Sequence, residues 1–428
     1  MQLATSRPIG YAIPVSQLDV LSSRNTLSDS ETAAVASLAH HRETMLAQVE
    51  AWSTINSGSR NLPGLVAVAD QLLAAFAPLG GTATLRDPAP ATAIDTAGTE
   101  RPLLHGQNLH ITKRSQAPVR VLLTGHMDTV FAADHPFQTS QWLGADTLNG
   151  PGTADMKGGL AVMLAALSAF EASPFAPLLG WEIVIVSDEE VSSPGSAPLL
   201  IEAANRCHLG LTYEPALPDG TLAGARKGSG NFSAIVTGRA AHAGREPEKG
   251  RNAILAAADL ALRLKALTAD DLSVNPAKID GGGPNNIVPD SAVLRWNMRP
   301  SNPVAQARAA AAIDTLAAEI AATHDVAIHI HGSFARPPKP LDANQQRLFD
   351  LVRTCGAAIG LPIAWRDTGG VCDGNNLAAT GLAVVDTLGP RGGAIHSPQE
   401  FLCADSLIER AQLSALILMR VAQSGWVR

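Results

Sequence analysis

The sequence predicts an α/β fold with a mostly parallel central sheet and helices on both faces, interrupted by an inserted ferredoxin-like α+β domain. Runs of Val, Ile and Leu alternate with helical stretches between residues 108 and 215, which is typical of a sheet buried on both faces. Residues 226–336 instead follow the order strand-helix-strand-strand-helix-strand, which is ferredoxin-like. Residues 337–428 return to the first style, so the smaller domain is predicted to be an insertion. A chain of 428 residues is long enough for two domains.

The chain is expected to begin with an arm and two helices. Residues 1–28 show no periodic pattern, and no role is assigned to this arm. Apolar positions recur at helical spacing over 30–55, and Ser28 or Ser30 is a plausible helix start because acidic residues follow. A second helix is predicted over 62–79, where two glycines end it.

Four strands are predicted in the first part of the larger domain, residues 29–225. Each is a short apolar run of the kind that a buried strand needs: 108–114, 119–127, 181–188 and 209–215. An Ala- and Leu-rich helix is expected at 158–170. In such sheets ligands bind beyond the carboxyl ends of the strands, so polar residues that follow these runs are candidates for a site.

The insertion, residues 226–336, is predicted to hold four strands and two helices. The helices are the Ala-rich stretches 252–267 and 305–322, and the strands are the apolar runs 231–238, 272–282, 292–299 and 326–332. The second part of the larger domain, 337–428, adds helices near 344–356 and 405–421 around the apolar run 382–389. Arg226 and Lys227, at the first junction, are expected to be hinge or surface charges.

Composition and charge disfavour several classes of function. The net charge is −7 and no basic stripe occurs, so small molecules rather than nucleic acids are the predicted partners. Four scattered cysteines without a CxxC pair fit a reducing cytoplasm rather than a disulfide framework. The N-terminus lacks the charged start and apolar run of a signal peptide, and no apolar stretch approaches about 18 residues, so neither secretion nor a membrane span is expected.

Imidazole and carboxylate groups recur after the predicted strands or in loops. They are His126, Asp128, Asp155, Glu189, Glu190, Glu214 and His396. A zinc-like ion accepts these ligands, and two ions about 3.5–4 Å apart need one bridging carboxylate with terminal ligands on each side. Asp155, among the glycines of GPGTADMKGG, is the candidate bridge, although it could instead cap a helix. A phosphate loop is disfavoured because the segment matches neither GxxxxGK[ST] nor GxGxxG.

Two adjacent glutamates, Glu189 and Glu190, follow the predicted strand 181–188. Like charges at the end of a buried strand repel one another, and a cation or a proton relieves that repulsion. One glutamate could bind metal while the other holds a water and moves its proton. A solvated loop pair is the alternative. His126 and Asp128 could likewise be a hydrogen-bonded loop pair, although metal-bound histidines usually donate their other N–H to such a partner.

Seven motifs in one order carry a family resemblance: HMD, GTADMKGG, DEE, YEP, RAAHAG, PNNIVPDS and GGAIHS. Together they resemble the dinuclear zinc metallopeptidases that include glutamate carboxypeptidase, acetylornithine deacetylase, succinyl-diaminopimelate desuccinylase and aminoacylase. The resemblance covers about residues 30–428 and is strongest to glutamate carboxypeptidase. One departure is GGVCDGNN, where Val371-Cys372 replaces a glycine-serine or glycine-threonine pair of many relatives.

The resemblance implies a role for each matched residue of the larger domain, which would be the zinc-peptidase-like catalytic domain. His126 and Glu214 would bind one metal ion. Glu190 and His396 would bind the other, and Asp155 would bridge the two. Glu189 would be the general base, Asp128 would support His126, and Gly370 would line the pocket wall.

The resemblance also gives the insertion a role as lid and dimerisation surface. His242 would reach the active site of the partner subunit and steady the oxyanion. Asn286 and Arg299 would grip the substrate, with the Arg299 guanidinium on a carboxylate. Alternatively, His242 simply ends a strand at a turn, and Arg299 pairs with a carboxylate of the insertion.

These observations predict a soluble, cytoplasmic, homodimeric metallohydrolase that cleaves an amide bond next to a free carboxylate. Its substrate would be a peptide or an N-acyl amino acid, and its cofactors two divalent ions, zinc before cobalt or manganese. A deacetylase or desuccinylase on the same fold is the near alternative. The alternatives of another class are a catalytically silent binding or scaffold protein, which loss of a ligand would favour, and a nucleotide-binding enzyme, which would lack metal dependence.

Overall fold

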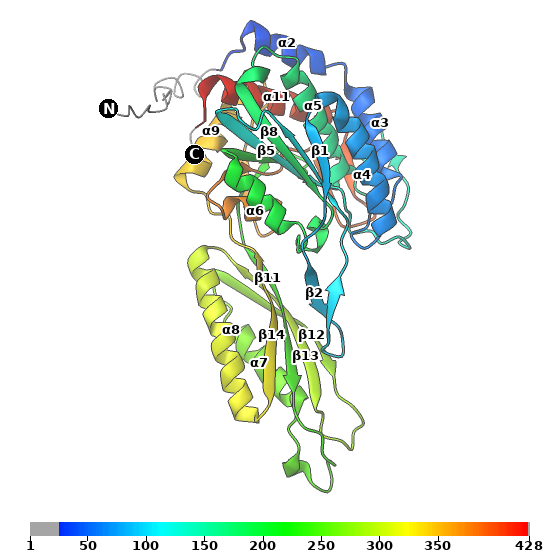
Figure 1. The fold of residues 1–428 in the computed structure, drawn as a ribbon, viewed down its shortest axis with the longest axis vertical. Helices are drawn as coiled ribbons and strands as arrows, with labels where there is room; N and C mark the ends of the chain where they lie inside the picture. Colours follow the sequence, from blue (N-terminus) through cyan, green and yellow to red (C-terminus); the bar gives the residue numbers. More distant parts are fainter. Residues whose placement is uncertain (1–24, 427–428) are drawn as a thin grey trace, which may run out of the picture.

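The computed structural model describes residues 25–426, so most of the predicted N-terminal arm lies outside it. Its larger body is built on a six-stranded sheet of order β1-β4-β8-β5-β9-β16 (Figure 1). The strands are β1 Thr82–Arg86, β4 Asn108–Lys113, β8 Leu179–Val186, β5 Val119–His126, β9 Leu209–Thr212 and β16 Ala383–Val385. The pairings among β8, β5, β9 and β16 are parallel, and β4 is antiparallel to both of its neighbours. The predicted mostly parallel sheet is therefore confirmed.

Helices cover both faces of this sheet because its strands are apolar on both sides. Leu123 and Ile183 face the main core, whereas Leu122 and Val184 face a second cluster on the other side. The main core is formed with α2 Asp29–Leu38, α3 Arg42–Ser53, α4 Leu62–Phe76, α5 Gly159–Glu171, α9 Ala343–Ala358 and α11 Ser406–Ser424. The second cluster is formed with α6 Ala197–Arg206 and α10 Asp373–Ala378.

The helix predicted over 30–55 is in fact two helices, α2 and α3, so that prediction was wrong in its length. Each packs on a different part of the core: α2 on α5 and α11, and α3 on α5 and the turn at 153–158. Of the two predicted helix starts, Ser28 is the residue that caps α2. Its Oγ accepts the N–H of Glu31, while the Glu31 carboxylate accepts the N–H of Ser28.

The segment Leu62–Leu79, which contains α4, is long and apolar enough to cross a membrane by length and composition. The expectation that no stretch reaches this length was therefore wrong. The buried residues of α4 are Leu65, Val68, Ala69, Leu72 and Phe76, which recur at the spacing of one helix face. That face packs against the main core, as the apolar face of an amphipathic helix does when the helix covers a sheet.

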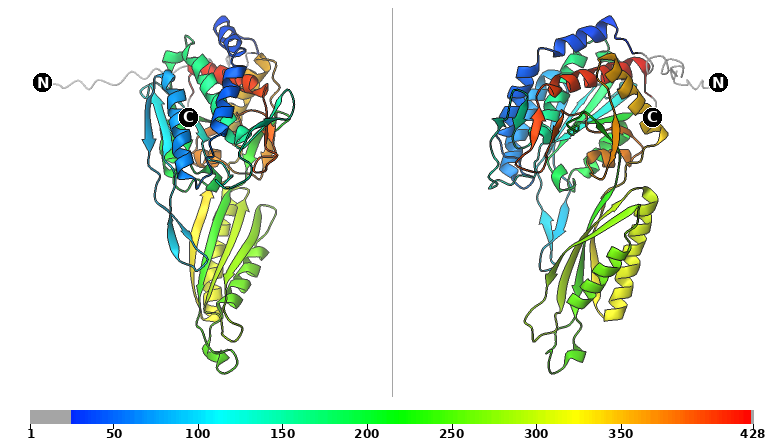
Figure 2. Two further views of the ribbon diagram at one scale, coloured as in Figure 1. Left: turned by 90° about the vertical axis from the view of Figure 1, so that its right-hand side faces the viewer. Right: turned by 180° about the vertical axis from the view of Figure 1, so that it is seen from behind.

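A second body, which we call the lid, lies below the larger one (Figures 1 and 2). Its sheet has the order β12-β13-β11-β14 and is antiparallel throughout. The elements in chain order are β11 Ser229–Thr237, α7 Ala253–Ala266, β12 Leu272–Gly281, β13 Ser291–Pro300, α8 Pro303–His324 and β14 Ala327–Arg336. This is the ferredoxin-like order that the sequence predicts. Stacked rings of Phe232 and Trp296, 5.3 Å apart, lie in its separate core.

A hairpin of β2 Ala91–Ile94 and β3 Glu100–Leu103 extends from the larger body to the lid, a link that the sequence does not predict (Figure 1). The Arg295 guanidinium of β13 donates to the carbonyls of Ile94 and Asp95. At the tip, Gly98 has φ +79°, and a Cβ there would lie 2.9 Å from the Ile235 side chain of β11. The hairpin thus packs on the sheet face that α7 and α8 leave open (Figure 2).

Two small sheets, also absent from the sequence prediction, hold loops at the edge of the larger body. One has the order β17-β18-β7-β6, with β17 Gly392–Gly393, β18 Phe401–Cys403, β7 Thr147–Asn149 and β6 Gln141–Trp142. The other pairs β10 Leu222–Arg226 with β15 Trp365–Thr368. Strands of two or three residues give too short a pattern to be read from sequence. The first of these sheets brings the loop of His396 beside the loop of Asp155.

Candidate metal centre

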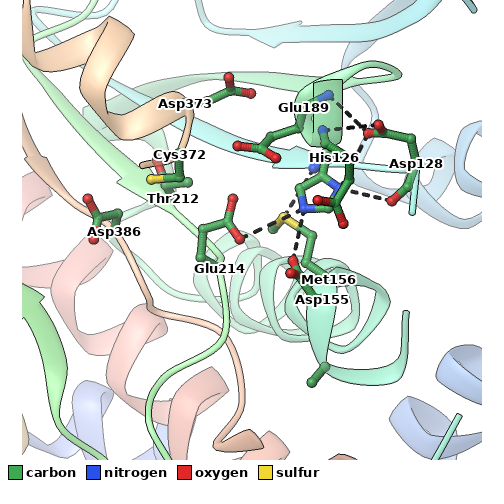
Figure 3. A network of polar contacts seen from close by, with 12 residues as sticks. His126, Asp128, Asp155, Met156, Glu189, Thr212, Glu214, Cys372, Asp373 and Asp386 are labelled. Atoms are coloured by element: carbon green, nitrogen blue, oxygen red, sulfur yellow. Dashed lines mark hydrogen bonds and ion pairs between the residues drawn. The ribbon is translucent and has the colours of Figure 1, made fainter. Parts of the chain in front are cut away.

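Seven of the predicted site residues converge at the carboxyl edge of the central sheet: His126, Asp128, Asp155, Glu189, Glu190, Glu214 and His396. His126 ends β5, Glu189 and Glu190 follow β8, and Glu214 follows β9. Because β5, β8 and β9 are parallel neighbours, their carboxyl ends meet at this edge. Figure 3 shows Asp155 and Glu214 pointing toward the His126 imidazole from neighbouring loops.

Asp155 lies between the two histidines. Its Oδ1 is 3.0 Å from Nε2 of His126, and its Oδ2 is 3.3 Å from Nε2 of His396. Each oxygen of one carboxylate therefore faces a different imidazole, which is the arrangement that a carboxylate bridging two ions needs. The partners on the two sides are Glu214, with Oε2 3.8 Å from His126 Nε2, and Glu190, with Oε2 3.1 Å from His396 Nε2.

The donor set fits divalent cations. Ligand atoms of His126, Glu189 and Glu214 lie within 4.8 Å of one another, as do those of His126, Asp155 and Glu190. Burial, together with the neighbouring Asp155 carboxylate, raises the pKa of Glu190 well above its usual value. Buried carboxylates this close repel one another, and cations relieve that repulsion. Imidazole nitrogen and carboxylate oxygen are also the ligand types that zinc accepts.

Glu189 is buried between the cluster and an arginine. Burial raises the pKa of its carboxyl to about 7, against the opposing effect of the Arg336 guanidinium, whose Nη2 is 2.8 Å from Oε1. Arg336 also donates to the Glu189 carbonyl and to Asp373. A carboxyl with a pKa near neutrality can both take up and release a proton.

Asp128 organises the same loop. The His126 Nδ1 is 3.0 Å from the Asp128 carbonyl and 3.4 Å from its Oδ1. The Asp128 carboxylate also accepts the N–H groups of Glu189 and Glu190 and the hydroxyl of Ser59. One buried carboxylate therefore orients an imidazole and both glutamates at once.

A cavity of about 520 Å³ opens between this cluster and the lid. The lid lines it with Ser229, Asn231, Asn297 and Arg299, and the larger body adds Gly370 and Cys372. Arg299 donates through Nε to Asn297 Oδ1 and through Nη1 to the Gly369 carbonyl, at 3.1 and 2.9 Å. Its Nη2 has no hydrogen-bond partner among residues 25–426 and is free to meet a ligand. Gly370 itself contributes a carbonyl to Arg226, so this loop holds two arginines through its backbone.

His242 and Asn286 do not line this cavity. Both lie in exposed loops of the lid, where the Ala243 N–H donates to the Asn286 carbonyl. The loop of His242 follows β11 at the end of the lid that points away from the larger body (Figure 1). Within one chain, the structure therefore brings neither residue to the candidate site.

Arg226 was wrongly expected to be a hinge or surface charge. Its side chain is buried, and its guanidinium donates from Nε and Nη2 to both oxygens of Asp386, at 2.9 and 3.0 Å. The Lys339 ammonium contacts the same carboxylate at 2.7 Å. These three residues lie on three separate segments, so no local pattern could have paired them. Arg226 lines the cavity beside the junction with the lid.

The comparisons with known proteins agree with this geometry. The model of Peptidase family M20/M25/M40 matches residues 122–420. Carboxypeptidase G2 of Pseudomonas sp. (strain RS-16) is 28% identical over 85% of this chain and 86% of the relative. A succinyl-diaminopimelate desuccinylase of Xanthomonas oryzae pv. oryzae is 30% identical over 68% of this chain and 81% of the relative.

Solved structures share the fold. An M20 family metallo-carboxypeptidase from Sulfolobus solfataricus aligns with a TM-score of 0.65 at 15% identity, over 88% of this chain and 99% of its own. A dinuclear metal-binding peptidase of the M20 family from Bacillus subtilis aligns with a TM-score of 0.64 at 13% identity, over 90% of this chain and 99% of its own. The family model covers well over half of the chain, and the predicted resemblance is confirmed. The chain belongs to Peptidase family M20/M25/M40.

Proposed function

We propose that this protein is a hydrolase with two divalent metal ions that cleaves an amide bond next to a free carboxylate. The observation that carries the proposal is Asp155, whose two oxygens face His126 and His396, each of which has a further carboxylate beside it. His126 and Glu214 would hold one ion, Glu190 and His396 the other, and Asp155 both. The family membership and the relatives named carboxypeptidase and desuccinylase support this reaction class.

The ions, when bound, supply a lowered pKa for a coordinated water and polarisation of the amide carbonyl. The protein's own residues supply the proton transfers. Glu189 accepts a proton from the attacking water and delivers it to the leaving amine, a role for which its buried position between the ligand cluster and Arg336 suits it. Arg336 and Asp128 hold this glutamate in place through its carbonyl, its carboxylate and its N–H.

Specificity for a free carboxylate is assigned to Arg299, which lines the cavity from the lid. Substrates whose carboxylate is amidated or esterified should lose most of their kcat/KM, because the guanidinium then has no anion to bind. Arg299→Ala should erase the difference between free and blocked substrates, and Arg299→Lys should restore only part of it, because a point charge lacks the fork. The measurement is kcat/KM over matched pairs of N-acyl amino acids and dipeptides. Equal cleavage of both members by the wild type would contradict the assignment and favour an aminopeptidase or a deacetylase that recognises its substrate through another group.

We also infer that two chains share each active site, with His242 and Asn286 reaching the cavity of a partner chain. In support, both residues lie far from the cavity of their own chain, and the dimer would form through the lid. The role of His242 would be to donate a hydrogen bond to the developing oxyanion. Zinc as the native metal and a cytoplasmic location complete the proposal. The four free cysteines support a reducing compartment.

Mixing two inactive variants tests the shared site. Glu189→Gln and His242→Ala homodimers should each be inactive or nearly so, but subunit exchange should form heterodimers with one wholly wild-type site. Activity should then return to as much as about half of the wild-type value per heterodimer, because one of the two sites is intact. The readout is turnover after exchange, with heterodimer formation followed by a mass tag on one partner. If heterodimers form and remain inactive, His242 does not act across subunits.

A further inference from the structure

Glu400 contacts the loop that carries Asp155, although it touches none of the cavity. Its Oε1 accepts the N–H groups of Ala154 and Asp155, both at 3.0 Å, and its Oε2 accepts the N–H of Gly152 at 3.1 Å. The side chain is buried, with the residue 1% exposed. Three backbone donors on one buried carboxylate fix the path of the segment that they come from.

The position of Glu400 in the chain is as informative as its contacts. It lies four residues after His396, and β18 begins directly after it. In the small sheet, β18 pairs with β7, which leads into the Asp155 loop, so Phe401 lies opposite Asn149. Backbone contacts continue this pairing, because the Glu400 carbonyl accepts from the Gly150 N–H and from the Asn149 side chain. The loops of His396 and Asp155 are thus joined through one residue.

We propose that Glu400 is a positioning residue for the metal centre, which sets the orientation of the bridging Asp155 through the backbone of residues 152–155. The Asp155 N–H faces Glu400 while its carboxylate faces the two imidazoles, so the loop is held on one side and presents its ligand on the other. Residues that orient metal ligands from behind typically change metal affinity or activity by about 10- to 100-fold when replaced. This inference rests on the proposed metal centre.

The test is metal affinity, measured by titrating metal-free protein with zinc against a competing chromophoric chelator. Glu400→Gln removes the charge and leaves a single acceptor oxygen for the three donors, so we expect the dissociation constants to rise by about 10- to 100-fold. Glu400→Asp keeps the charge but is shorter by one methylene group and cannot reach all three N–H groups, so we expect it to bind zinc weakly as well. If Glu400→Gln does not fold, the zinc affinity of Glu400→Asp alone tests the proposal.

Glu31→Gln is the matched control for a general loss of stability. Glu31 is another fully buried glutamate, paired with Arg420 at 3.2 Å where α2 packs on α11, and it is not part of the metal cluster. This variant should lower the Tm of the metal-free protein without changing the zinc dissociation constants. Wild-type zinc affinity in Glu400→Gln would overturn the positioning role. Wild-type zinc affinity in Glu400→Asp would also overturn it, because it would show that only the charge of residue 400 matters. Failure of the wild type to bind zinc would instead contradict the proposed function.

Discussion

Replacement of Glu189 by Gln is expected to lower turnover at least about 100-fold, the low end for the loss of a general acid or base, which equals about 2.7 kcal/mol of transition-state stabilisation. The amide keeps the size of the side chain but cannot accept the proton of the attacking water. Because Glu189 is assigned no ion, metal content should stay near the wild-type value. Turnover and metal content per chain are measured on the same purified sample.

Glu190→Gln is the matched control for this prediction, because the two residues are neighbours on one loop and differ in their assigned role. Glu190 faces His396 at 3.1 Å, and its replacement should deplete bound metal as well as activity. The structure makes the comparison necessary, because Glu189 also lies within ligand distance of His126 and Glu214. If Glu189→Gln loses metal and Glu190→Gln keeps it, the two roles are reversed.

Removal of divalent cations is expected to abolish hydrolysis altogether. His126, Asp155, Glu190, Glu214 and His396 are assigned as ligands, and the nucleophile of the proposed reaction is a water that the ions would activate. Activity should return when zinc or cobalt is added to the chelated protein. Added metal should also raise the Tm, because an ion that binds only the folded chain stabilises it in proportion to RT ln(1 + [L]/Kd).

The measurement is turnover against metal content in exhaustively chelated samples, with thermal unfolding followed alongside. Glu190→Gln provides the control, because a variant with a damaged site should gain less Tm from the same addition of zinc. Full activity in a sample verified to be free of metal would rule out the dinuclear mechanism.

The sequence alone determined the ligand candidates and the sheet on which they lie. His126, the glutamate pair and Glu214 follow apolar runs, and parallel strands bring their carboxyl ends to one edge, so local patterns were enough to predict that these residues meet. The lid order was equally readable, because long amphipathic strands and Ala-rich helices carry strong periodic signals. His396 and Asp155 lie in loops without such a signal, so their residue types alone made them candidates, and no local pattern predicted that they meet the other ligands.

Only the tertiary structure shows which side chains contact and orient the proposed metal-binding residues and the buried charges around them. Arg226 belongs to a buried cluster with Asp386 and Lys339, and Glu400 accepts from the loop of Asp155 across about 250 residues of chain. His396 has φ +62°, a conformation that the surrounding loops must impose. Buried charges need partners, but the partners come from whichever segments the fold brings near, and neither periodicity nor spacing records that. Local sequence therefore predicted the ligands, whereas their support depends on long-range packing.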